Sequence, residues 1–162
     1  MTTELQRIAS VSPTSPGTLA VLWRDGRTEF VDLSGWIATG GEILKPLQRV
    51  DVFATAAVSD YGAAVQWGDD DDLAIDAHHL SRLALLQRPL GADGLRDWQE
   101  RIDLSNNEAA DFFDVALSTW NLWRASGNIP RTAQTLCRAA ELDPDIVSAR
   151  LRPRKAGRPA KA

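Results

Sequence analysis

The sequence has few of the residues that usually carry catalysis, metal binding or covalent cross-linking. Of its 162 residues, one is cysteine and two are histidine. An internal disulfide is therefore impossible, and a reducing compartment is expected. No segment approaches the roughly 18 consecutive apolar residues of a membrane span, and residues 1–7 lack the apolar core of a signal peptide. We expect a cytoplasmic chain with no membrane partner.

The residues that could support chemistry are isolated or unsuited to it. His78 and His79 are adjacent, so on a helix they point about 100° apart and cannot both bind one metal ion without distortion. The four aspartates 69–72 lack the central glycine and distal glutamate of a calcium loop. Cys137 lies among apolar residues at helical spacing and is expected in the core. Since no Gly-rich phosphate loop is present either, we expect no enzyme activity, metal or cofactor.

Charge is distributed unevenly along the chain. The net charge is −4, but residues 1–93 carry 7 basic and 13 acidic side chains, whereas residues 94–162 carry 11 and 9. The last thirteen residues hold six basic side chains and no acidic one. An acidic front and a basic end are typical of a chain whose regions have separate tasks.

The first ninety residues have the pattern of an α+β domain. Apolar segments 19–23 and 28–32 flank Asp25-Gly26, which predicts a β-hairpin. Segments 52–58 and 63–67 predict a second hairpin around Tyr61. One or two helices are expected, a short one over 33–37 and a longer one from about Ile75 to Gln87.

From Asp93 onward the periodicity is helical. Ser105 and Glu108 have the spacing of a capping box, and Pro130 suits the first position of a helix. Five helices are expected up to Leu151. We therefore predict an α+β domain over 1–91, an all-α five-helix bundle over 92–152 and a basic disordered tail over 153–162.

Residues 104–115, followed by 116–124 and Ile129-Pro130, resemble the helix-turn-helix of phage-repressor-like DNA-binding domains. The resemblance covers roughly residues 93–151. It implies that the second helix of the motif enters the major groove. The residues that it places at the DNA are Asn106 at a phosphate, Leu117, Ser118 and Asn121 at base edges, and Arg124 near the backbone or groove wall.

The sequence departs from that family in its turn and in its charge. Asp114 stands where the turn usually has glycine, and Ser126 where another glycine is expected. Aspartate enters the left-handed region more readily than most residues. Residues 104–131 hold two basic and three acidic side chains, so the module alone should bind DNA weakly. A helical bundle used for protein contact is the alternative.

The basic end has a pattern of its own. Residues 153–161 resemble an AT-hook, with Ala156 in place of the usual first arginine. The resemblance implies that Arg158 enters a narrow minor groove, beside Arg154 and Lys155. The alternative is a solvated basic tail that adds attraction without selecting a sequence.

Dispersed positions between residues 5 and 80 resemble a small bacterial domain of unknown function, found alone or fused to a helix-turn-helix. They include segments 19–26, 46–47 and 65–67. The resemblance implies an α+β fold and no established activity, and some relatives belong to toxin–antitoxin gene pairs. We predict a two-domain transcriptional regulator of the repressor type that binds double-stranded DNA as a homodimer. The alternative is a protein-interaction module, such as the antitoxin-like partner of a toxin.

Overall fold

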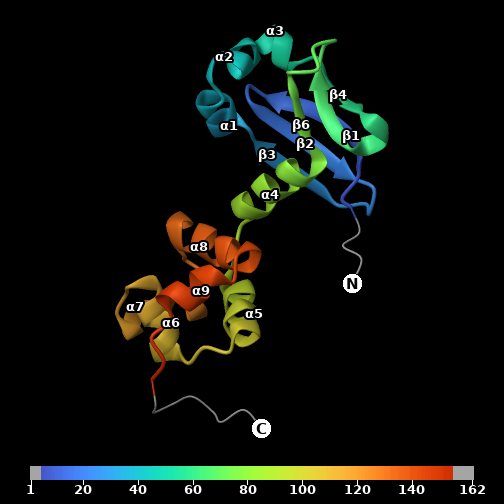
Figure 1. Ribbon diagram of the computed structural model, residues 1–162. Helices are drawn as coiled ribbons and strands as arrows, with labels where there is room; N and C mark the ends of the chain where they lie inside the picture. The colour runs from blue at the N-terminus through green and yellow to red at the C-terminus, as the bar shows by residue number, and fades with distance from the viewer. Residues whose placement is uncertain (1–4, 155–162) are drawn as a thin grey trace. The chain divides into compact units, whose positions relative to one another are not determined.

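The computed structural model describes residues 5–154 (Figure 1), and the chain divides into two compact units between Gln87 and Arg88. Each unit buries its own hydrophobic core. Within residues 5–154, no helix is both long enough and apolar enough to cross a membrane.

The first unit combines two three-stranded antiparallel sheets, ordered β1-β2-β3 and β4-β5-β6, with short helices between them and a longer helix at the end. Its elements are β1 (Ile8–Ser15), β2 (Thr18–Trp23), β3 (Thr28–Asp32), α1 (Ser34–Thr39), α2 (Gly41–Leu44), η1 (Lys45–Gln48), α3 (Val50–Phe53), β4 (Ala56–Ser59), η2 (Asp60–Gly62), β5 (Ala64–Trp67), β6 (Ala74–Asp76) and α4 (Ala77–Gln87).

The first predicted hairpin is present as β2 and β3. Strand β2 alternates as expected, because Leu19, Val21 and Trp23 are buried while the residues between them are not. Gly26 closes the turn at φ +91°, a conformation that glycine adopts without steric cost. These inward residues form one wall of the core. The unit is therefore α+β, as predicted.

The strand predicted over 52–58 is wrong in its first half. Residues Val50–Phe53 form the short helix α3, and the strand starts only at Ala56. The reason is a tertiary contact. The Trp67 indole N–H donates to the Phe53 carbonyl at 3.1 Å, and the two rings pack with centroids 5.8 Å apart. This packing overrides the local preference of the valines for a strand.

Two other elements differ from the expectation. The sequence pattern does not indicate strand β1, because this segment is rich in serine and threonine and has few apolar residues; it pairs along β2. Helix α4 begins at Ala77, after the short strand β6. Its last residue, Gln87, uses its side-chain amide to bond the N–H and the carbonyl of Asp32 at 2.8 and 2.7 Å. The end of α4 is thereby tied to β3.

The second unit is helical over its described length. Its elements are α5 (Ala92–Ile102), α6 (Asn106–Phe113), α7 (Leu117–Ser126), α8 (Arg131–Leu142) and α9 (Asp145–Arg150). Its core contains leucine and alanine side chains and the aromatic side chains of Trp98, Phe112, Phe113, Trp120 and Trp123.

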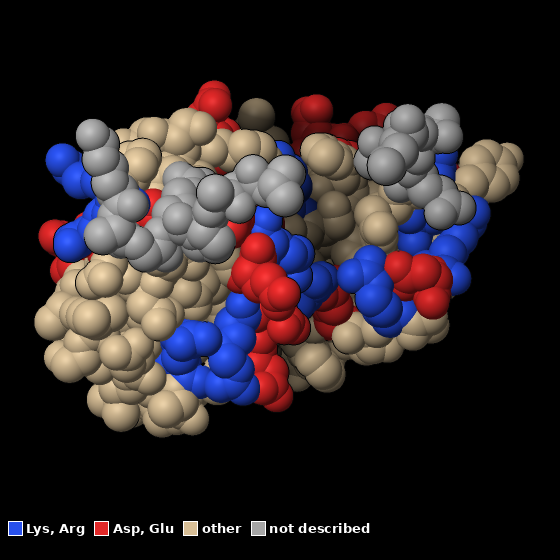
Figure 2. Space-filling model, turned by 90° about the horizontal axis from the view of Figure 1, so that it is seen from below, with Lys and Arg blue, Asp and Glu red and all other residues tan. Residues whose placement is uncertain are grey.

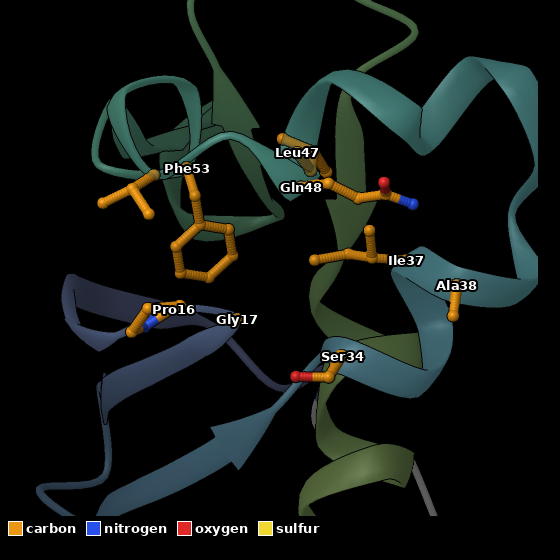
Figure 3. A pocket seen from close by; sticks show the side chains of 9 residues that line it. Pro16, Gly17, Ser34, Ile37, Ala38, Leu47, Gln48 and Phe53 are labelled. Carbon is orange, nitrogen blue, oxygen red and sulfur yellow. The ribbon is translucent and has the colours of Figure 1, made fainter.

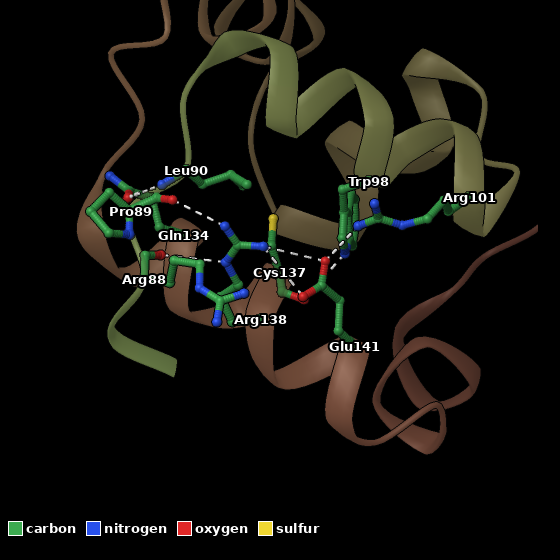
Figure 4. A network of polar contacts seen from close by, with 9 residues as sticks. All are labelled: Arg88, Pro89, Leu90, Trp98, Arg101, Gln134, Cys137, Arg138 and Glu141. Carbon is green, nitrogen blue, oxygen red and sulfur yellow. Dashed lines mark hydrogen bonds and ion pairs between the residues drawn. The ribbon is translucent and has the colours of Figure 1, made fainter. Parts of the chain in front are cut away.

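The segment 88–90 belongs to this second unit, since Leu90 is buried in its core. We call the contacts that hold this segment the α8 network; they come from Gln134, Arg138 and Glu141 of α8, with Arg101 of α5 (Figure 4). The Arg138 guanidinium donates to the carbonyls of residues 88 and 89 at 3.3 and 3.0 Å. The Gln134 amide oxygen accepts from the Leu90 N–H at 2.8 Å. Glu141 pairs with both Arg138 and Arg101.

Candidate nucleic-acid interface

Helices α6 and α7 are joined by a turn of three residues, Asp114, Val115 and Ala116. Asp114 has φ 57° and ψ 44°, so the left-handed conformation anticipated for it is confirmed. The Val115 N–H donates to the Ala110 carbonyl at 3.0 Å, and its side chain packs against the core. Helix α7 therefore follows α6 directly, through a short turn that is bonded to α6.

The start of α6 is fixed by the predicted capping box, which is confirmed. The Glu108 N–H donates to the Ser105 hydroxyl at 3.2 Å, and the Ser105 N–H donates to the Glu108 carboxylate at 2.8 Å. These two bonds satisfy backbone donors that a helix leaves open at its start. The carboxylate is completely buried. The position of α6 is therefore set by a buried polar contact as well as by packing.

Helix α7 is held by two indoles on its inner side. Trp120 and Trp123 are buried, as the sequence predicted for Trp120. The Trp120 ring stacks on Phe113 with centroids 5.5 Å apart and an angle of 13° between the planes. Because the indoles fix the rotation of α7 about its axis, the opposite side of the helix faces away from the core.

That opposite side carries the three predicted base readers and two further apolar residues. Leu117, Ser118, Asn121, Leu122 and Ala125 are all exposed, and we call these five the α7 outward face. Among the described residues, neither the Ser118 hydroxyl nor the Asn121 amide has a hydrogen-bond partner. The structure therefore brings together Leu117, Ser118 and Asn121, which the sequence singled out. Sequence reasoning missed Leu122, although its spacing of four residues from Ser118 indicated the same side.

Asn106 is oriented by a polar chain that joins three helices. Its side-chain oxygen accepts from the Gln99 amide at 3.0 Å and from the Trp120 indole N–H at 3.2 Å. Gln99 is itself buried and also donates to the Leu104 carbonyl. With the oxygen held inward, the Asn106 amide nitrogen keeps its donors; it has no acceptor among the described residues. An outward amide donor at the start of a helix suits an anionic group.

Arg124 lies on α7 at the border of the outward face. The residue is half-buried, and its Nε is buried without a hydrogen-bond partner in the described part of the chain. The Arg124 carbonyl is occupied, because it accepts from the Arg96 guanidinium. Its guanidinium forms no ion pair with any described residue, which leaves its charge available.

The end of α9 and the residues that follow it contact α6. The Arg154 guanidinium pairs with both carboxylate oxygens of Asp111 at 2.8 and 2.9 Å, and the Arg154 backbone N–H donates to the Glu108 carboxylate at 3.3 Å. Arg150 donates to the Phe112 carbonyl at 2.8 Å and lies over the Phe112 ring. Arg154, predicted at DNA, thus neutralises an acid of the supporting helix. Lys155 and Arg158 lie outside the described residues.

Basic and acidic side chains are nearly equal in number in the described part of the helical unit. Residues 88–154 contain nine basic and ten acidic side chains. On the face drawn in Figure 2, the basic side chains are interspersed with acidic ones. In the α8 network, Arg101 and Arg138 are committed to Glu141 and to carbonyls. Residues 88–154 therefore carry no excess of positive charge.

The two histidines and the cysteine are not placed for metal binding or nucleophilic chemistry. His78 and His79 are exposed on α4, and the described part of the chain contains no cluster of three or more metal-ligating side chains. Cys137 is buried in the helical core as predicted, and burial raises the pKa of its thiol to about 12 from an ordinary 9.0. A thiol with such a pKa stays protonated and is a poor nucleophile.

The first unit has a partly open cavity of about 320 Å³ between the β1–β2 turn, α1, η1 and α3 (Figure 3). Buried Ile37, Leu47 and Phe53 line its inner part. Ser34 and Gln48 are its polar side chains, and no lining residue is charged. This lining suits a compact, mainly apolar group, and it offers no acid or base for catalysis.

The chain was compared with protein families, curated proteins and solved structures. No protein-family model matches the sequence, and no curated protein matches it. The crystal structure of a "putative DNA binding protein" from Nitrosomonas europaea aligns with a TM-score of 0.46 and 22% sequence identity, over 84% of this chain and 86% of that one. This score is too low to support a fold or a function.

Proposed function

We propose that this protein is a sequence-specific, double-stranded DNA-binding protein, a transcriptional regulator of the repressor type that uses α7 as its recognition helix. The observation that carries the proposal is the α7 outward face. The inner side of α7 is locked by Trp120 and Trp123, while the outer side presents Ser118 and Asn121 without partners among the described residues. In helix-turn-helix proteins, such outward residues contact base edges in the major groove.

The groups around α7 fit the remaining parts of a groove contact. Asn106 offers an amide donor at the start of the supporting helix, oriented by Gln99 and Trp120. Arg124 brings a cation to the border of the face, with no ion pair to a described residue. Phosphate contacts of this kind fix the register of a protein on the duplex, while the base contacts select the sequence.

The electrostatics give the basic tail a defined task. Nonspecific affinity for DNA depends on how many phosphates the protein neutralises. Residues 88–154 hold nine basic and ten acidic side chains, so they supply no net positive charge for this purpose. Lys155, Arg158 and Lys161 supply further cations. We infer that α7 selects the sequence and that the tail supplies much of the attraction. As in other repressors, two copies would bind paired half-sites.

The test is selection from random duplexes, followed by titration of the selected site at several salt concentrations. It uses the full chain and a chain ending at Arg154, which keeps the Asp111 contact and removes the three tail cations. We expect the same preferred site for both, with a salt slope lower by about 0.9 for each phosphate that the shortened chain no longer neutralises. Failure of both chains to select any site would overturn the proposal.

A protein-interaction module, such as an antitoxin, is the second candidate. It is favoured by the absence of charge on the α7 outward face, where Leu117 and Leu122 are 40% and 60% exposed. Large apolar side chains exposed on one helix are typical of protein contacts. In that case a partner protein, and not a duplex, would protect Leu122 from solvent.

A further inference from the structure

The α7 outward face contains hydrogen-bonding and apolar side chains but no ionised one. Its residues are Leu117, Ser118, Asn121, Leu122 and Ala125. Guanine is most often read by arginine or lysine, and cytosine donates its amino group to aspartate or glutamate. None of these four residue types is present on the face. The side chains that commonly read a G·C pair are therefore missing from the part of α7 that faces outward.

Asn121 supplies the polar half of a different contact. Its carboxamide has a donor and an acceptor arm, and neither is used by a described residue. This pair of groups matches the N6 donor and N7 acceptor that adenine presents in the major groove. Trp120 and Trp123, which precede and follow Asn121 in the sequence, are buried and fix the rotation of α7 about its axis. The direction in which the Asn121 side chain projects from the helix is therefore fixed as well.

Leu122 supplies the apolar half. Its side chain is 60% exposed and lies next to Asn121 along the chain, with Leu117 one helical turn before Asn121. An exposed leucine gains free energy only where it meets another apolar group. In the major groove that group is the C5 methyl of thymine, which the partner of adenine carries and cytosine lacks.

We propose that the α7 outward face selects A·T-rich half-sites, and that Leu122 is a specificity-determining residue that contacts a thymine methyl. This inference rests on the proposed function and adds the base composition of the site and the residue that reads the methyl. Asn121 recognises adenine edges, and Leu122 recognises the methyl of a neighbouring thymine.

The test uses the full chain and duplexes with uracil in place of thymine, since uracil lacks only the C5 methyl. Each thymine of the selected site is replaced in turn, and the affinity is measured for the wild type, Leu122→Ala and Ile43→Ala. Ile43 is 62% exposed in the first unit, so it is a matched control. For the wild type and the control, one thymine should show a decrease in affinity of about three- to fourfold, which corresponds to one buried methyl. Leu122→Ala should bind both duplexes equally.

Each outcome bears on a definite claim. A selected site with G·C pairs at every specified position would overturn this inference but leave DNA binding in place. Equal uracil sensitivity of the wild type and Leu122→Ala at all thymines would remove Leu122 as the methyl reader. If no duplex is preferred by the full chain, the proposed function fails, and this inference fails with it.

Discussion

The α7 outward face and the α8 network lie in the same unit and use their polar groups in opposite ways. In the α8 network, Arg138 directs its donors to two carbonyls and Glu141, and Glu141 also binds Arg101. On the α7 outward face, Ser118 and Asn121 have no partner among the described residues. The comparison teaches that these arginines serve to hold the unit together, while the groups that the α7 outward face leaves for binding are uncharged.

Trp120→Ala should have the largest effect, because it removes the contact that locks α7. The indole is fully buried, stacks on Phe113 and donates to Asn106. Loss of a buried Trp side chain costs about 3–5 kcal/mol of unfolding free energy, measured by urea unfolding. Asn128→Ala, at an exposed position after α7, is the control. An unchanged midpoint for Trp120→Ala would show that α7 is held by other contacts.

Arg138→Ala should have a moderate effect on stability and none on sequence selection. The substitution leaves the carbonyls of Arg88 and Pro89 without this donor and Glu141 with one arginine fewer. Partly buried acceptors left in this way cost about 1–3 kcal/mol, again measured by urea unfolding. A change in the preferred DNA site for this variant would contradict the division between the two regions.

Arg154→Ala and Asp111→Asn break the same ion pair, which is partly exposed. Each should cost about 0–1 kcal/mol of stability. Their effects on DNA affinity should be opposite, because one removes a positive charge and the other a negative charge near the duplex. Fluorescence anisotropy at low salt measures this. Equal shifts in the same direction would mean that the pair acts by positioning the segment and not by charge.

The Cys137 thiol should have no effect on the pH dependence of stability near neutral pH, and its effect should be seen only at high pH. Its folded pKa of about 12 lies above the ordinary 9.0, so the folded state holds the proton more tightly than the unfolded state. This contribution to stability is complete below pH 9 and decreases as the pH rises from 9 towards 12. A thiol reagent should react at pH 8 only after unfolding. Rapid reaction of the native protein would contradict the burial.

The elements that local chemistry specifies could be predicted, and those that tertiary contacts specify could not. The β2–β3 hairpin, the Ser105–Glu108 capping box and the left-handed Asp114 follow from turn and cap chemistry within a few residues. Helix α3 depends on a contact with Trp67, which is fourteen residues away in the sequence, so local patterns could not find it. Strand β1 pairs with the neighbouring β2 across the turn at residues 16–17, but its serine-rich sequence lacks the alternation that indicates a strand.

The same distinction applies to the candidate site. The resemblance to a helix-turn-helix was sufficient to single out Ser118 and Asn121, and both are exposed. It gave no access to the Gln99–Asn106–Trp120 chain or to the pairing of Arg154 with Asp111. These contacts join residues on different elements, so only the folded structure brings them together.

The most direct test of the central claim compares Asn121→Ala with Asn128→Ala in two measurements, urea unfolding and affinity for the selected duplex. Both residues are asparagines of the helical unit that are not buried, so both variants should keep the wild-type stability to within about 0.5 kcal/mol. Asn121→Ala alone should lose about 1–3 kcal/mol of binding free energy and relax the choice of one base pair. Wild-type affinity for Asn121→Ala on that duplex would contradict the assignment of α7 as the recognition helix.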